Sequence, residues 1–111
     1  METNATKSII KSGSKAVLLC FLPPAASGES VQERTRLLAL SQRLQQRLPG
    51  LIRVLNVDES LHPDVVRSFN LQQLPALVLV QQGIERWRQE GVQTWEELTL
   101  IPYLLEQVNG L

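Results

Sequence analysis

The chain has 111 residues, of which 43% are apolar and 20% charged, and its 11 basic side chains balance 11 acidic ones. This length suits one domain with one hydrophobic core, and the composition is that of a folded globular chain. A net charge of zero argues against nucleic-acid or membrane partners, which a basic surface normally attracts. One cysteine and one histidine leave no ordinary set of metal ligands, so we expect no metal and no cofactor.

Residues 1–14 are interpreted as a partly flexible N-terminal segment that precedes a single domain of residues 15–111. Its one apolar pair, Ile9-Ile10, is too short for the apolar centre of a signal peptide. No stretch approaches the roughly 20 apolar residues that span a bilayer. We therefore expect a cytoplasmic protein, and the single cysteine agrees, because small exported domains more often carry disulfides.

The first predicted elements are a strand and a long helix. Residues 15–22, KAVLLCFL, form an apolar run of strand length that two prolines stop, which predicts a strand buried on both faces. The next segment has helical periodicity, because four leucines share one face: Leu37, Leu40, Leu44 and Leu48. Ser30 and Glu33 have the spacing of a capping box at the start of this helix, and Pro49-Gly50 is typical of its end.

A second strand and a short helix follow. Residues 51–57, LIRVLNV, predict a strand parallel to the first, since a helix connects the two. Pro63 and Asp64 favour the first turn of a short helix over residues 63–69.

The C-terminal part is predicted to form a hairpin and a last helix. Residues 76–81 and 84–89 read as two strands joined by a tight Gln82-Gly83 turn. The final helix is placed at residues 94–109, begun by a Thr94–Glu97 capping box and ended at Gly110.

This order of elements predicts an α/β domain, a βαβαββα sandwich with a mixed four-stranded core sheet to which the N-terminal segment could add an element. The core is predicted to contain Leu37, Leu40, Leu44, Val54, Leu77, Leu79 and Leu105.

The stretch from 69 to 83, FNLQQLPALVLVQQG, resembles the most recognisable part of the thioredoxin family, and the likeness extends over about residues 15–111. In that family a short helix ends in an aromatic residue, here Phe69, and a proline, here Pro75, opens the hairpin strand. The resemblance implies a thioredoxin-like fold, a cis bond before Pro75, and Gly91 beside the active end. Without it Pro75 would be expected trans, because only about 5% of X-Pro bonds are cis.

The segment that follows the first strand departs from the family. Thioredoxins carry C-x-x-C at the start of the long helix, where the helix dipole lowers the thiol pKa. Here residues 23–30 read PPAASGES, and either Ser27 and Ser30 or Ala26 and Glu29 stand at the cysteine positions. Neither pair can form a disulfide, so we expect no thiol-disulfide exchange and no enzyme of that kind.

Cys20 lies inside the apolar first strand and is interpreted as a core residue, because burial raises a thiol's pKa and blocks attack on it. A one-cysteine thiol-dependent oxidoreductase that uses Cys20 is the enzymatic alternative. Ser27 and Ser30 fit a turn and a helix cap better than catalysis, since His62 is poorly placed to act as their base.

The remaining polar and aromatic candidates are given structural roles. His62 is expected at the surface or at a helix cap, and Trp87 and Trp95 are expected to pack. The charged side chains of the last strand are interpreted as protection of a sheet edge against pairing with other chains: Glu85, Arg86, Arg88 and Glu90.

The resemblance also implies a binding role, because the family's main chain just before the proline pairs with extended peptides, as an added strand does. We predict a redox-inactive, chaperone-like module that binds a peptide or protein, with a purely structural homo-oligomer formed through the sheet edge as an alternative. The candidate docking residues are Ser27, Ser30, Leu74, Pro75 and Gly91.

Overall fold

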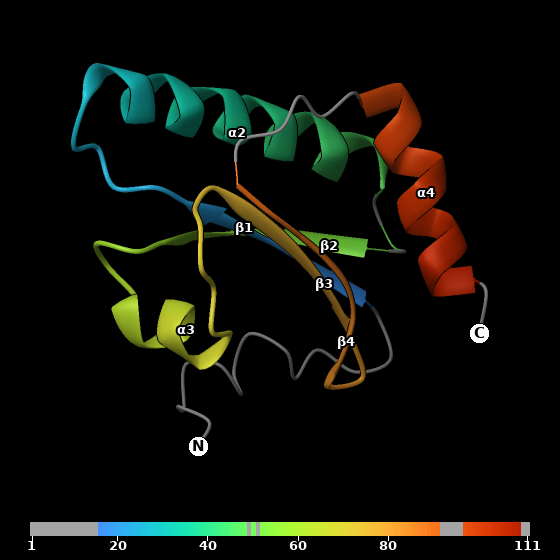
Figure 1. The fold of residues 1–111 in the computed structure, drawn as a ribbon. Helices are drawn as coiled ribbons and strands as arrows, with labels where there is room; N and C mark the ends of the chain where they lie inside the picture. The colour runs from blue at the N-terminus through green and yellow to red at the C-terminus, as the bar shows by residue number, and fades with distance from the viewer. Residues whose placement is uncertain (1–15, 49, 51, 92–96, 110–111) are drawn as a thin grey trace.

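Each run of apolar residues that ends at a proline, a glycine or a polar turn has become a strand, and each leucine-periodic segment a helix. The computed structural model (Figure 1) describes residues 16–48, 50, 52–91 and 97–109. The elements in chain order are β1 (Ala16–Leu22), α2 (Gly28–Arg47), β2 (Ile52–Asp58), α3 (Pro63–Ser68), β3 (Ala76–Gln81), β4 (Ile84–Glu90) and α4 (Glu97–Asn109).

The four strands form one sheet in the order β2-β1-β3-β4. β1 runs parallel to β2 and antiparallel to β3, and β3 runs antiparallel to β4. Every residue of the two central strands is buried, whereas β2 and β4 are partly exposed, as edge strands are. The predicted α/β class and mixed four-stranded sheet are confirmed.

Side chains alternate between two apolar clusters, one on each face of the sheet. The leucines of α2 pack with Leu100 and Leu104 of α4 over one face, and α3 covers the other face with Val65 and Val66 (Figure 1). Of the predicted core residues, five are buried and lie in the first cluster: Leu37, Leu40, Leu44, Leu77 and Leu79. Val54 and Leu105, also predicted in the core, are only partly buried and pack against that cluster from its edge. Val54 lies on an edge strand with a neighbour on one side only.

The start of α2 also corrects the sequence analysis. The helix begins at Gly28, and Ser27 is the N-cap with extended backbone. The Ser27 hydroxyl accepts the Ser30 N–H at 3.2 Å, and the Ser30 hydroxyl accepts the Ser27 N–H at 2.9 Å. The capping box therefore joins Ser27 to Ser30 rather than Ser30 to Glu33, because serine at the third helical position closes the box earlier in the chain.

The hairpin turn is confirmed at Gln82 and Gly83, which both have positive φ, 54° and 77°. The other boundaries differ from the prediction by only a residue or so, as in β2, which extends through Asp58, apart from α4, whose predicted start at residue 94 lies outside the described residues. Several sequence predictions lie outside the described residues: segment 1–14, Lys15, Pro49, Leu51, the Thr94 cap, Trp95 and Gly110. No helix in the described part of the chain is long and apolar enough to cross a membrane.

Candidate functional site

The strand register brings three predicted site segments to one end of the sheet. Phe21 of β1 is paired with Ala76 of β3, and Ala76 is paired with Glu90 of β4. Pro75, just before Ala76, and Gly91, just after Glu90, therefore lie side by side at that end. The Gly91 N–H donates to the Pro75 carbonyl oxygen at 3.0 Å, which closes the corner between β3 and β4.

Leu74 and Pro75 form the centre of this corner. The Leu74-Pro75 peptide bond is cis, as the family resemblance implied. Pro75 is buried, and the half-buried Leu74 side chain packs against the apolar cluster beneath α3. No hydrogen bond joins the main chain of Leu74 to any of the residues that the structure describes. The corner thus offers a main-chain donor and acceptor next to the first residue of β3.

Glu90, the last residue of β4, holds the loop that leads into this corner. Its carboxylate accepts the Gln72 N–H at 2.6 Å and the Gln73 N–H at 3.1 Å. The same carboxylate accepts Arg88 Nη1 at 2.8 Å. The hydrogen bond from Arg88, and then those from the two amides, lower the pKa of Glu90. Ionised Glu90 is therefore the form that fixes the loop.

Arg88 adds a second tie to the same loop, because its Nη2 donates to the Phe69 carbonyl oxygen at 2.8 Å. It also makes a two-bond ion pair with Glu85, at 2.7 and 2.8 Å. These bonds, with the Glu85 bond as the largest contribution, raise the pKa of Arg88. Arg88 and Glu90, which the sequence analysis assigned to edge protection, thus anchor the loop before Pro75. Arg86 Nε is buried with no hydrogen-bond partner among the described residues.

Gly91 suits this corner because of its backbone conformation. Its φ is +90°, a region that residues with a Cβ rarely adopt. A Cβ built on Gly91 would stand 2.3 Å from Gln73 Oε1. Glycine therefore lets the end of β4 lie directly against Gln73 in the loop that carries Leu74.

Ser27 and Ser30, the other two predicted site residues, are engaged in capping α2. Besides the reciprocal box, the Ser30 hydroxyl accepts the Ala26 N–H at 3.1 Å and donates to the Ser27 carbonyl oxygen at 3.1 Å. No hydrogen bond among the described residues connects these serines to Leu74 or Pro75. The structure therefore groups Leu74, Pro75 and Gly91, while both serines serve the helix end.

An ion pair that the sequence analysis missed fixes the loop between β1 and α2. Arg34 of α2 pairs with Asp58 at the end of β2, and these side chains are 26% and 16% exposed. Arg34 Nη1 also donates to the Pro23 carbonyl oxygen at 3.2 Å. The hydrogen bond from Arg34 lowers the pKa of Asp58. The pair is anchored from both sides, because Asp58 also accepts the Ser60 N–H at 2.9 Å.

Cys20 lies at the middle of β1, where its side chain belongs to the cluster beneath α2. It is 0% exposed. Burial raises the pKa of its thiol to about 12. A thiol in this state is neutral near pH 7 and out of reach of a disulfide.

His62 lies at the surface, and Trp87 makes a packing contact. His62 is exposed at the N-cap of α3 and makes no side-chain capping bond, so it has the surface role and not the capping one. Trp87 packs edge-on against Tyr103 with ring centroids 5.6 Å apart. Among the described residues, no three His, Cys, Asp or Glu side chains lie close enough to hold a metal.

Comparison with known sequences and structures identifies the fold. No family model and no curated protein matches the sequence. The structure of a malarial protein matches with a TM-score of 0.60 at 18% identity, over 80% of this chain and 94% of that one. The structure of chloroplastic thioredoxin z matches with a TM-score of 0.71 at 16% identity, over 99% of this chain and 92% of that one. The chain therefore has a thioredoxin-like fold.

Proposed function

We propose that this protein binds an extended segment of a peptide or protein at the Leu74–Pro75 corner, without thiol-disulfide exchange. The observation that carries the proposal is the main chain of Leu74, which has no hydrogen-bond partner among the described residues although it adjoins a buried strand. A main-chain donor and acceptor at such a place recognise another main chain in extended conformation, as an added strand does.

The corner is organised before a partner arrives. Glu90 and Arg88 hold the loop through Gln72, Gln73 and Phe69. A loop that is already fixed loses less conformational entropy on binding, which favours affinity. The half-buried Leu74 side chain adds an apolar surface beside the polar main chain.

The absence of exchange chemistry is part of the proposal. The chain has one cysteine, and a dithiol couple needs two thiols. The start of α2, where thioredoxins place their cysteines, carries the Ser27–Ser30 capping box instead. Burial of Cys20 disfavours the one-cysteine alternative, since attack requires an accessible thiolate.

The test begins with a phage-displayed peptide library panned on the purified protein. A selected peptide, labelled with fluorescein, is then titrated by fluorescence polarisation. Leu74→Asp should raise its Kd at least about tenfold, because the substitution puts a charge into the docking surface. Leu74 packs on the core, so this variant also melts lower, and binding is compared at a temperature where circular dichroism shows both proteins folded.

Ile84→Asp is the matched control, because it introduces the same charge at an exposed apolar residue beside the hairpin turn, at the opposite end of β4. The proposal expects the control to bind as the wild type does. It is rejected if Leu74→Asp binds the peptide with unchanged affinity, or if both variants lose binding equally.

A further inference from the structure

The edge of the sheet formed by β2 carries main-chain groups that point away from the neighbouring strand β1. Val54 identifies them, because its N–H donates to the Gln45 side chain at 2.8 Å and not to β1. Residues two apart in a strand point their N–H and C=O groups to the same side. Asn56 therefore points its main-chain N–H and C=O groups outward as Val54 does.

The two edges of the sheet differ in their protection against pairing. β4 has one extra residue, Arg86, where its pairing with β3 shifts between Leu79 and Val80, and it carries charged side chains, features that keep other strands away. β2 pairs with β1 in unbroken register and contains no proline. Between Arg53 and Asp58 it carries only uncharged residues. The β2 edge is thus the open one.

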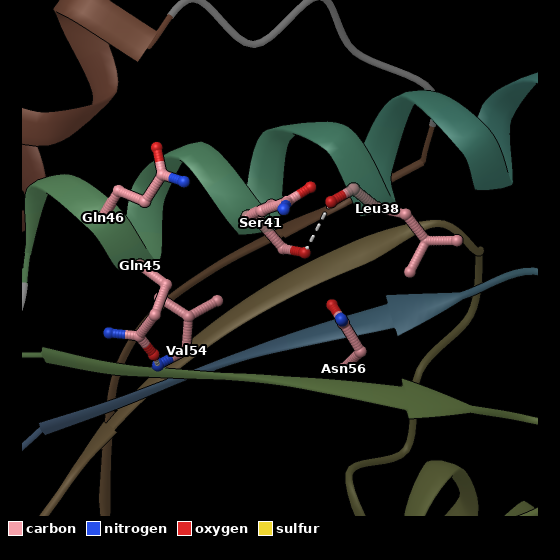
Figure 2. Close-up of a pocket in the computed structure, with 7 residues that line it drawn as sticks. Leu38, Ser41, Gln45, Gln46, Val54 and Asn56 are labelled. Atoms are coloured by element: carbon pink, nitrogen blue, oxygen red, sulfur yellow. Dashed lines mark hydrogen bonds between the residues drawn. The ribbon is translucent and has the colours of Figure 1, made fainter.

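A groove runs along this edge, between β2 and α2 (Figure 2). Its volume is about 500 Å³, and Val54 and Asn56 lie on the side of β2 that faces α2 (Figure 2). The lining combines one exposed leucine of α2, Leu38, with amide and hydroxyl side chains: Ser41, Gln42, Gln45, Gln46 and Asn56. Such neutral hydrogen-bond donors and acceptors can pair with the identical surface of a second copy of this chain.

We propose that a second copy of this chain pairs with the β2 edge, strand against strand and antiparallel, to form a symmetric dimer with a continuous sheet. The twofold axis passes beside Leu55. In this register Val54 of each copy stands opposite Asn56 of the other, so that these outward-pointing residues exchange hydrogen bonds. The inference is independent of peptide docking at Leu74.

The residues that meet in this register are compatible. Leu55 meets Leu55 of the second copy on the face that α3 covers, and Arg53 stands opposite Val57. Arg53 also lies diagonal to Glu59 of the second copy, within reach of a long side chain. No like charges stand opposite one another between Ile52 and Asp58.

The dyad also brings the grooves of the two copies together. It is perpendicular to the sheet, so the two α2 helices lie on the same face and run antiparallel. The groove of each copy then opens onto the groove of the other, and Leu38 and Gln42 of each copy come to lie between the helices. Gln45, which bonds Val54 in the single chain, is released to bond across the dyad when Asn56 of the second copy takes its place.

Sedimentation velocity over a concentration series tests the dimer. The full chain should shift from 12.5 kDa to twice that mass with rising concentration. Asn56→Pro removes one of the outward N–H groups that the dimer would use, so it should raise the dimer dissociation constant at least about tenfold. Asn56→Lys, which introduces a residue that fits any strand geometry, should also raise the dimer dissociation constant. Gln32→Lys, exposed on α2, should leave the dimer unchanged.

Disulfide trapping tests the register. At the dyad, opposite Cα atoms of a non-hydrogen-bonded pair lie about 4.5 Å apart, within the range of a disulfide. Leu55→Cys should therefore form a covalent dimer under mild oxidation, whereas Arg53→Cys, opposite Val57, should not. Cys20 stays silent because it is buried. A wild-type monomer at all concentrations, or a dimer that Asn56→Pro and Asn56→Lys leave intact, overturns the proposal. Equal trapping at 53 and 55 does so as well.

Discussion

Replacing Glu90 by glutamine should loosen the loop before Pro75 while keeping the shape of the side chain. The carboxylate now accepts the N–H groups of Gln72 and Gln73, at 2.6 and 3.1 Å, and one nitrogen of Arg88, at 2.8 Å. Glutamine keeps an oxygen for the two amides but loses the charge. Its NH₂ group must also face the Arg88 guanidinium, which has only donors to offer.

The weakened hydrogen bonds determine how much the free energy of unfolding falls in Glu90→Gln. A hydrogen bond to a charged group contributes about 1.5–3 kcal/mol and a neutral one about 0.5–1.5 kcal/mol, so each amide bond weakens by about 1 kcal/mol and the Arg88 bond is lost. Glu90 is 22% exposed, so water compensates for part of this loss. We expect the free energy of unfolding to fall by about 1–2 kcal/mol.

Urea unfolding followed by circular dichroism measures this loss, and amide hydrogen exchange locates it. Because each 1.4 kcal/mol is a factor of about ten, the Gln72 and Gln73 amides should exchange roughly 5 to 30 times faster in Glu90→Gln. Glu106→Gln, an exposed substitution in α4 with the same change of charge, is the control. Equal exchange of these two amides in both variants would refute the assignment of Glu90 as the residue that holds the loop.

Three further predictions concern acid, the helix cap and the thiol. Asp58 and Glu90 have pKa values lowered in the folded protein by their arginine partners; the unfolded chain therefore binds more protons, and the free energy of unfolding should decrease as pH falls below about 5, with a flatter curve in Glu90→Gln. Ser27→Ala should cost about 1 kcal/mol in urea unfolding through loss of the N-cap, and a change below about 0.3 kcal/mol would contradict that role. Dithiobisnitrobenzoate should label Cys20 only in denaturant, and insulin reduction by dithiothreitol should match the buffer blank; turnover that Cys20→Ser abolishes would establish the one-cysteine enzyme instead.

The fold was predictable because the apolar runs and the helical leucine spacing of the sequence coincide with the segments that are buried in the structure. β1 is an apolar run that ends at two prolines, and every one of its residues is buried. The helical spacing of Leu37, Leu40 and Leu44 placed them correctly in the core. The start of α2 was missed because two overlapping serine patterns could each close a capping box, and only three-dimensional structure selects Ser27 over Ser30.

The candidate site was predictable only in part. The family resemblance supplied Pro75 and Gly91, and strand order then brings them together. The anchoring roles of Glu90 and Arg88 could not be read from the sequence, since they depend on the register of β4 and on its irregularity between Glu85 and Trp87. Ion pairs such as Arg34–Asp58 likewise leave no local pattern in the sequence, because the partners are far apart in the chain and meet only when it folds.

The most direct measurement of the central claim is the amide signal of Leu74 in a ¹⁵N–¹H correlation spectrum, recorded with and without a peptide selected by display. If the Leu74 main chain is the docking group, its amide proton should shift downfield and exchange at least about tenfold more slowly when peptide is bound. The Gln72 and Gln73 amides, already bonded to Glu90, should change little. An unmoved Leu74 signal, with the peptide-induced shifts gathered on β2 or α4, would contradict the account.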